Sequence, residues 1–257
     1  MVCAPQKPEA EQVIVETAQR RGCPLILLDR EWTWERTASD LTGQSMTVQC
    51  HIPGHDGLVP GGSTEEFRVP FLGSYQVTNA VTALATLDQL YRQGIAFTLE
   101  DVRRGLRSTR WPGRLEILNQ GPLLVMDGAH NVDSVQRLMH ALAQDLSFQR
   151  LIVVAGFSAD KDIAGMMREL GSHADELILT QSIHPRAARP ADLAKQAPKG
   201  GAHICTADDV PSALWQALDL ATAQDLVCVT GSLFVVAEAR AAWLDYRSIA
   251  FPRDPLP

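Results

Sequence analysis

The sequence predicts an α/β protein whose second half forms a mostly parallel β-sheet of Rossmann-like type, covered by helices on both faces. Short apolar runs of strand length recur after residue 110, and amphipathic helical segments separate most of them. Such alternation is typical of parallel sheets between helical layers. Hydrophobic residues make up 46% of the 257 residues and charged residues 21%, as in ordinary globular proteins. This length suits one complete domain plus part of another.

The first 110 residues follow a different pattern. Apolar spacing predicts a helix over residues 9–21, and an apolar run predicts a strand at residues 25–28. Residues 31–72 alternate short β-prone pieces with turn-rich stretches, which indicates hairpins. Apolar residues on one face over 77–91 predict a further helix that ends near Gly94.

We place the domain boundary within residues 108–114, where Ser, Thr, Pro and Gly cluster. The strands predicted beyond it are 115–118, 123–126, 151–155, 176–180, 203–205 and 226–230. The helices predicted between and after them cover 135–142, 163–170, 211–220 and 233–244. Their Met and Trp residues are expected to be core residues.

Polar residues follow four of these predicted strands. They are Asp127, His130 and Asn131; Ser158, Asp160, Lys161 and Asp162; Thr180, Ser182, His184 and Arg186; and Ser232. In open α/β sheets ligands bind beyond the carboxyl ends of the strands, where helix N-termini point amide groups outward. We therefore expect these side chains to meet at one edge of the sheet.

Each of these residues has a functional and a structural interpretation. Asp127 could orient the His130 imidazole or bind a ribose hydroxyl, or, like Asn131, cap the following helix. Lys161 could neutralise a phosphate or carboxylate, or remain a solvated surface charge. Ser232 could hold a substrate carboxylate, or act as a helix N-cap.

Composition and missing motifs exclude several classes of protein. A formal net charge of −7 argues against nucleic-acid binding, which needs a basic face. The five cysteines are scattered without zinc-site spacing, which indicates reduced thiols. We recognise no signal peptide and no apolar run of membrane-spanning length, so a cytoplasmic protein without membrane association is expected. The phosphate-binding patterns G-x-x-x-x-G-K-[ST] and G-x-G-x-x-G are absent from the sequence.

Six strings occur in a characteristic order: APQKPEA (4–10), GSYQVTNAVTAL (73–84), WPGRLE (111–116), MDGAHN (126–131), GFSADKD (156–162) and VTGSLFVVAE (229–238). As an ordered set they resemble the folylpolyglutamate synthase and dihydrofolate synthase branch of the Mur ligase superfamily. The resemblance implies that residues 1–110 are the truncated C-terminal part of the central ATPase domain. Residues 111–257 would be the C-terminal glutamate-ligase domain.

The resemblance also implies roles for single residues. Asn79 would lie by the adenine of ATP, Arg114 would reach its phosphates, and Asp127 would contact the nucleoside. His130 and Lys161 would belong to the catalytic machinery. His130 and Ser232 would bind the incoming glutamate.

The reaction implied is ATP-dependent amide bond formation between L-glutamate and a folate or pteroate carboxylate, through an acyl phosphate. In the family the phosphate loop and the Mg²⁺ ligands precede the APQ-PEA stretch, so no metal ligand is assigned here. The isolated chain is expected to be incomplete and inactive, and the full-length protein to be a monomer. Two alternatives stay open: a non-catalytic binding module with this fold, or a Mur-type ligase with a different acceptor.

Overall fold

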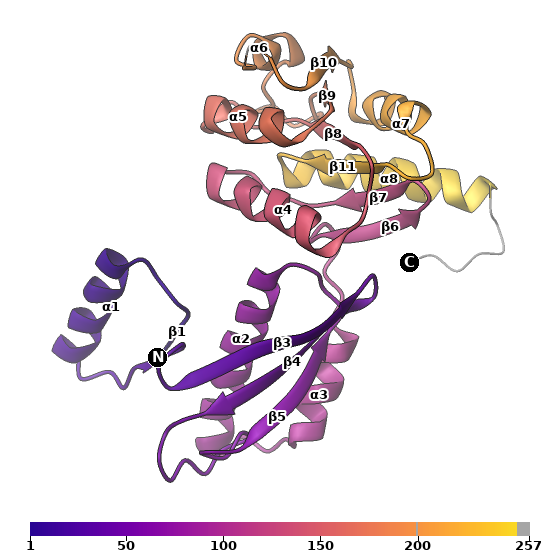
Figure 1. Ribbon diagram of the computed structural model, residues 1–257. Coiled ribbons are helices and arrows are strands. Elements are labelled where there is room, and N and C mark those ends of the chain that lie inside the picture. The colour runs from indigo at the N-terminus through magenta and orange to yellow at the C-terminus, as the bar shows by residue number, and fades with distance from the viewer. Residues whose placement is uncertain (199, 251–257) are drawn as a thin grey trace. The chain divides into compact units, whose positions relative to one another are not determined.

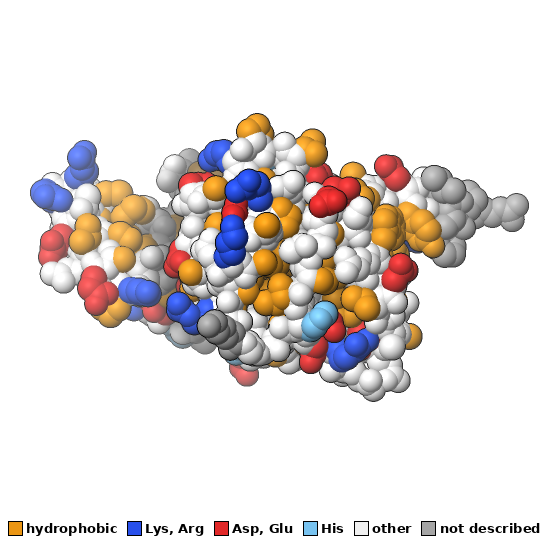
Figure 2. Space-filling view, turned by 90° about the horizontal axis from the view of Figure 1, so that it is seen from above, with side chains coloured by type: hydrophobic (Ala, Val, Ile, Leu, Met, Phe, Trp, Pro, Cys, Tyr) orange, Lys and Arg blue, Asp and Glu red, His pale blue; other side chains and the backbone are white. Residues whose placement is uncertain are grey.

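The computed structural model describes residues 1–198 and 200–250, and the chain divides into two compact units, Met1–Arg110 and Trp111–Pro257 (Figure 1). Acidic and basic side chains are interspersed with hydrophobic ones on the face drawn in Figure 2, which therefore presents no continuous basic surface. Among the described residues, no helix is both long enough and apolar enough to cross a membrane.

The first unit combines two small sheets with three helices. Its elements are β1 (Val2–Cys3), α1 (Pro8–Arg20), β2 (Ile26–Leu27), β3 (Trp32–Asp40), β4 (Gly43–Cys50), β5 (Thr64–Val69), α2 (Ser74–Arg92) and α3 (Leu99–Ser108). Strands β3, β4 and β5 pair antiparallel in that order, which confirms the predicted hairpins, while β1 and β2 form a short parallel pair. Alternate residues of β4, such as Met46 and Val48, are fully buried in a core that includes Val81 and Leu84 of α2.

Helix α3 was not predicted from the sequence, although its start carries a recognisable signal. The Thr98 hydroxyl accepts the Asp101 amide at 3.1 Å, and the Asp101 carboxylate accepts the Thr98 amide at 2.9 Å. This reciprocal pair is a capping box, which satisfies amides at the first turn that have no partner within the helix. The spacing Thr-x-x-Asp would have located the helix N-terminus.

The second unit is built on one larger sheet. Its elements are β6 (Glu116–Gln120), β7 (Leu123–Met126), α4 (Val132–Asp145), β8 (Leu151–Ala155), α5 (Ile163–His173), β9 (Glu176–Leu179), α6 (Pro190–Ala194), β10 (His203–Thr206), α7 (Val210–Leu220), β11 (Leu226–Thr230) and α8 (Leu233–Ala250). Within the described residues the strand order is β10-β9-β8-β11-β7-β6. The first five of these strands run parallel, which confirms the predicted fold class, and β6 pairs antiparallel with β7 at the edge.

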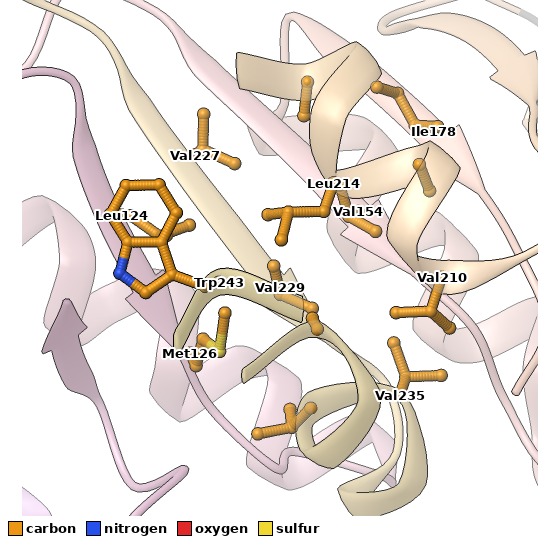
Figure 3. Close-up of a cluster of buried hydrophobic side chains, with 14 of the residues drawn as sticks. Leu124, Met126, Val154, Ile178, Val210, Leu214, Val227, Val229, Val235 and Trp243 are labelled. Atoms are coloured by element: carbon orange, nitrogen blue, oxygen red, sulfur yellow. The ribbon is translucent and has the colours of Figure 1, made fainter. Parts of the chain in front are cut away.

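Helices cover both faces of this sheet. Val227 and Val229 of β11 and Val154 of β8 pack against α7 and α8 in a buried cluster that includes Leu214 and Trp243 (Figure 3). Helices α4 and α5 contact each other on the other side (Figure 1). Neighbouring strands β7 and β11 therefore lead into helices on opposite faces, which is the condition that opens a crevice at the carboxyl ends of such strands.

Candidate functional site

The predicted polar residues of the second unit lie at one edge of its sheet. Strands β9, β8, β11 and β7 are consecutive parallel neighbours, so the loops that follow them share the carboxyl edge. Asp127 and His130 follow β7, Lys161 follows β8, and Ser232 follows β11. The convergence expected from the sequence is thus present, at the point where the chain leaves the sheet toward opposite faces.

Asp127 anchors two backbone segments. Its side chain is almost fully buried: the residue is 4% exposed. One carboxylate oxygen accepts the amide of Ala129 at 2.8 Å, and the other accepts the amide of Leu115 at 2.9 Å. Helix α4 is capped by Asn131, whose side chain accepts the Ser134 amide at 2.8 Å. Of the two residues considered as caps, Asn131 takes that role, and Asp127 joins the β7–α4 loop to the segment that precedes β6.

His130 is oriented by the backbone of its own loop. Its Nδ1 lies 2.9 Å from the carbonyl oxygen of Gly128, and the residue is exposed. Since a carbonyl oxygen only accepts, Nδ1 must carry the proton, and the neutral ring then has its lone pair on Nε2. The imidazole therefore offers an acceptor at an exposed position on the carboxyl edge.

Arg114 projects from a tight turn before β6. The residues on either side of it, Gly113 and Leu115, have φ angles of 71° and 45°. The Arg114 guanidinium carbon lies 5.5 Å from the ring centroid of Trp111, which is 59% exposed. An arginine held over an exposed indole is available to an anion in solvent.

Ser232 immediately precedes helix α8 and is 7% exposed. Its hydroxyl oxygen accepts the Phe234 amide at 3.2 Å, so the N-cap interpretation holds. A hydroxyl that accepts in this way still has its own proton to donate. Gly231 before it has a φ of 97°, and a Cβ there would lie 2.6 Å from the Gly156 carbonyl oxygen, so β8 and β11 are closely packed at this edge.

Lys161 lies in a loop that is tied to its neighbour. The amide of Ala188 donates to Phe157 O and that of Ala159 to Arg186 O, both at 2.8 Å, which joins the loops after β8 and β9. The Lys161 ammonium is 3.6 Å from Asp160 and its side chain is 39% exposed. It remains a partly exposed cation beside the candidate site.

Asn79 belongs to the first unit. It lies on α2 and is exposed, and its side-chain amide donates to Gln76 Oε1 at 3.0 Å. The two residues are three positions apart and share a helix face. The pair leaves the Asn79 side-chain oxygen as an available acceptor.

Two side-chain contacts at the edge were not predicted from the sequence. The His184 ring stacks on Phe234 with centroids 3.9 Å apart, and Arg240 of α8 pairs with Glu116 at 3.0 Å. These partners are separated by 50 or more positions, so no local spacing could have found them. Within the described residues, no group of three or more His, Cys, Asp or Glu side chains could hold a metal ion.

Comparison with known proteins adds information that the geometry alone lacks. The family model described as "Mur ligase, glutamate ligase domain" matches residues 113–233. A probable bifunctional folylpolyglutamate synthase/dihydropteroate synthase of Halobacterium salinarum is 34% identical over 214 residues, which cover 81% of this chain and 26% of that protein.

Solved structures give similar matches. The folylpolyglutamate synthase of Mycobacterium tuberculosis complexed with ADP superposes with a TM-score of 0.82 at 26% identity, covering 99% of this chain and 55% of that one. A bifunctional folylpolyglutamate synthase/dihydrofolate synthase from Yersinia pestis, complexed with AMPPNP and a Mn ion, gives a TM-score of 0.72 at 30% identity, covering 93% and 51%. The chain spans about half the length of both solved relatives.

Proposed function

This chain belongs to the folylpolyglutamate synthase and dihydrofolate synthase family of the Mur ligases, and we propose from that membership that it carries the C-terminal half of an ATP-dependent ligase site. The ligase joins L-glutamate to the carboxylate of a folate or pteroate. The observation that carries the proposal is the placement of Asp127, His130 and Ser232 at the carboxyl edge, where β7 and β11 lead to opposite faces.

The chemistry requires activation, because a carboxylate is a poor electrophile. ATP phosphorylates it, and the resulting acyl phosphate offers a good leaving group to the glutamate amine. Arg114 offsets negative charge on the phosphates as it redistributes. Asp127 contacts the nucleoside and Asn79 the adenine. Most of the rate enhancement comes from positioning and electrostatic stabilisation.

Glutamate is bound between two groups with complementary donors and acceptors. The His130 Nε2 lone pair accepts from the amine of the incoming glutamate, since Nδ1 is committed to Gly128 O. The Ser232 hydroxyl donates to a glutamate carboxylate while its oxygen keeps the Phe234 amide. Lys161 supplies a further positive charge where phosphate and carboxylate meet.

The domain assignment follows the same proposal. Residues 1–110 form the C-terminal part of the central ATPase domain, and residues 111–257 form the glutamate-ligase domain. Mg²⁺ accompanies ATP on its phosphates, and no residue of this chain is assigned to it. The chain by itself does not turn over, because the phosphate-binding loop that would face Arg114 is not in its sequence. The full-length enzyme is a cytoplasmic monomer.

A chimeric enzyme tests this proposal. Residues 1–257 would be fused behind the portion of the M. tuberculosis relative that the chain does not match, and ADP release measured with pteroate or folate, glutamate, ATP and Mg²⁺. We expect turnover by the fusion, none by the chain alone, and a loss in the Arg114→Gln fusion. Turnover by the chain alone would refute its incompleteness.

Two other outcomes identify the alternatives. A folded fusion that uses glutamate only with a different acceptor carboxylate indicates a Mur-type ligase of another specificity. A folded chain that binds neither ADP nor glutamate in calorimetry, in a fusion without activity, indicates a non-catalytic module.

A further inference from the structure

The turn that presents Arg114 has an unusual backbone. Gly113 and Leu115 flank the arginine with φ angles of 71° and 45°, and both lie in the left-handed region. Glycine adopts this conformation freely, whereas leucine does so against the contact between its Cβ and the following carbonyl. A leucine in this region persists only where its surroundings hold it.

Hydrogen bonds hold the turn on both sides of Arg114. The Gly113 amide donates to Glu116 Oε2 at 2.9 Å, and its carbonyl accepts the Gly128 amide at 2.9 Å. The Leu115 amide donates to Asp127 Oδ2, also at 2.9 Å. The direction in which Arg114 leaves the backbone is thus fixed by two carboxylates, those of Glu116 and Asp127.

Helix α8 holds the first of these carboxylates. Arg240 Nε lies 3.0 Å from both oxygens of Glu116, and a second guanidinium nitrogen contacts Oε1 at 3.0 Å. The two side chains are 26% and 17% exposed. A charge-assisted, multiply bonded arginine fixes a carboxylate in orientation as well as position.

The same face of α8 also limits the turn sterically. A Cβ on Gly113 would lie 2.8 Å from Val236, which is one helical turn before Arg240. Residues four positions apart share a helix face. The same face of α8 therefore carries Val236, which limits the space beside Gly113, and Arg240, which binds Glu116. Ser232 immediately precedes α8 and caps it, so this one helix connects the turn that holds Arg114 with the loop after β11.

We propose that Arg240 and Glu116 are positioning residues for Arg114. Arg240 orients the Glu116 carboxylate, Glu116 fixes the Gly113 amide, and the guanidinium of Arg114 is thereby aimed at the nucleotide phosphates. The contact between Arg114 and phosphate rests on the proposed function. The clamp between α8 and the turn does not.

The test measures the turn and the nucleotide separately in the full chain. The Gly113 amide is followed by NMR, through its chemical shift and hydrogen exchange, in the wild type, Arg240→Gln and Arg240→Lys. Calorimetry then compares ADP with adenosine, which lacks the phosphates that Arg114 contacts. Arg150→Gln is the matched control, because it removes an arginine that pairs at 2.7 Å with Asp225, ahead of β11 at the amino edge.

We expect Arg240→Gln to shift the Gly113 amide, to speed its exchange, and to weaken ADP binding about tenfold, with adenosine unchanged. Arg240→Lys should recover part of both effects, and the control should alter neither. The double variant Arg114→Gln/Arg240→Gln should bind ADP no more weakly than Arg114→Gln, since Arg240 acts through Arg114.

An unchanged Gly113 amide in folded Arg240→Gln, or additive losses in the double variant, overturns the proposal. If Arg240→Gln does not fold, Arg240→Lys and Glu116→Gln provide the same comparison. If the wild-type chain binds no ADP, the nucleotide comparison is made in the fusion described above, where absence of ADP binding refutes the proposed function, while the amide measurement still decides whether the clamp exists.

Discussion

Replacement of Asp127 by asparagine tests whether its carboxylate stabilises the folded second unit, in addition to any contact that it makes with a ligand. Both carboxylate oxygens accept backbone amides, from Ala129 and Leu115, in a residue that is 4% exposed. An asparagine side chain has one oxygen and one NH₂ group, so one of these amides would face another donor. The substitution therefore removes one charge-assisted hydrogen bond outright and weakens the other.

The size of the effect follows from these two bonds. A hydrogen bond to a charged group contributes about 1.5 to 3 kcal/mol, and a buried amide without an acceptor costs a similar amount. We expect Asp127→Asn to lower the free energy of unfolding by about 2 to 3 kcal/mol. With a urea dependence of about 2 kcal/mol per M, the midpoint of the affected transition moves down by about 1 M or more.

Asp162→Asn is the matched control for this experiment. Asp162 caps α5 with one oxygen, which accepts the Gly165 amide at 2.9 Å, and asparagine caps helices about as well as aspartate. Urea unfolding followed by circular dichroism at pH 7 should place the control within about 0.5 kcal/mol of the wild type. Equal stability of Asp127→Asn and Asp162→Asn would refute the anchor.

Three further predictions concern the same unit and the cysteines. The hydrogen bond from Arg150 lowers the pKa of Asp225 from 3.8 to about 2. Asp225→Asn should therefore lower the free energy of unfolding in urea by about 1 to 2 kcal/mol at pH 7, and this difference should persist above about pH 4 and vanish as the pH falls through 2. A stability difference that stays constant down to pH 2 would contradict the pairing of Arg150 with Asp225. Gly231→Ala should lower the free energy of unfolding by about 2 kcal/mol or more in the same assay, because φ is 97° and the added Cβ would lie 2.6 Å from Gly156 O. The control Gly105→Ala on α3 has nothing within 4 Å of its added Cβ, so the free energy of unfolding should stay the same or rise by up to about 1 kcal/mol. Similar values for the two variants would contradict the close packing at Gly231. Of the five thiols, exposed Cys23 should react first with a thiol reagent in the native protein. Cys228 should react only after unfolding, because burial, and to a smaller extent the charge of Asp127, raises the pKa of its thiol. Mass spectrometry of labelled peptides measures the order of reaction.

Periodicity predicted the larger sheet because its strands are fully buried. The segments 123–126 and 151–155 are continuous apolar runs and appear as β7 and β8, and 226–229 is a third such run, which continues to Thr230 as β11. A strand covered on both faces needs apolar residues at every position, so the signal is strong and local. The first predicted strand was displaced for the opposite reason: Leu115 is apolar, yet its positive φ places it in the turn before β6.

The candidate site was predicted in its location but only partly in its internal contacts. Strand-to-helix connections put Asp127, His130 and Ser232 at one edge, and any parallel sheet with this order would do so. Their hydrogen-bond partners are mostly backbone groups, such as the Leu115 amide and the Gly128 carbonyl. Backbone groups have no residue type to identify them in a sequence, so that part of the site was not predictable.

The clamp on Arg114 illustrates the remaining difficulty. Glu116 and Arg240 are 124 positions apart, and each one alone is an ordinary charged residue on a strand or a helix. Only the order of the strands, which places α8 next to the turn before β6, makes them partners. An isolated surface pair of this kind contributes little to stability. The proposed role of the pair is to orient the turn: Arg240 fixes the Glu116 carboxylate, and that carboxylate accepts the Gly113 amide. Phosphate recognition by Arg114 would then depend on Arg240 of α8, which lies outside the six strings that carry the family resemblance.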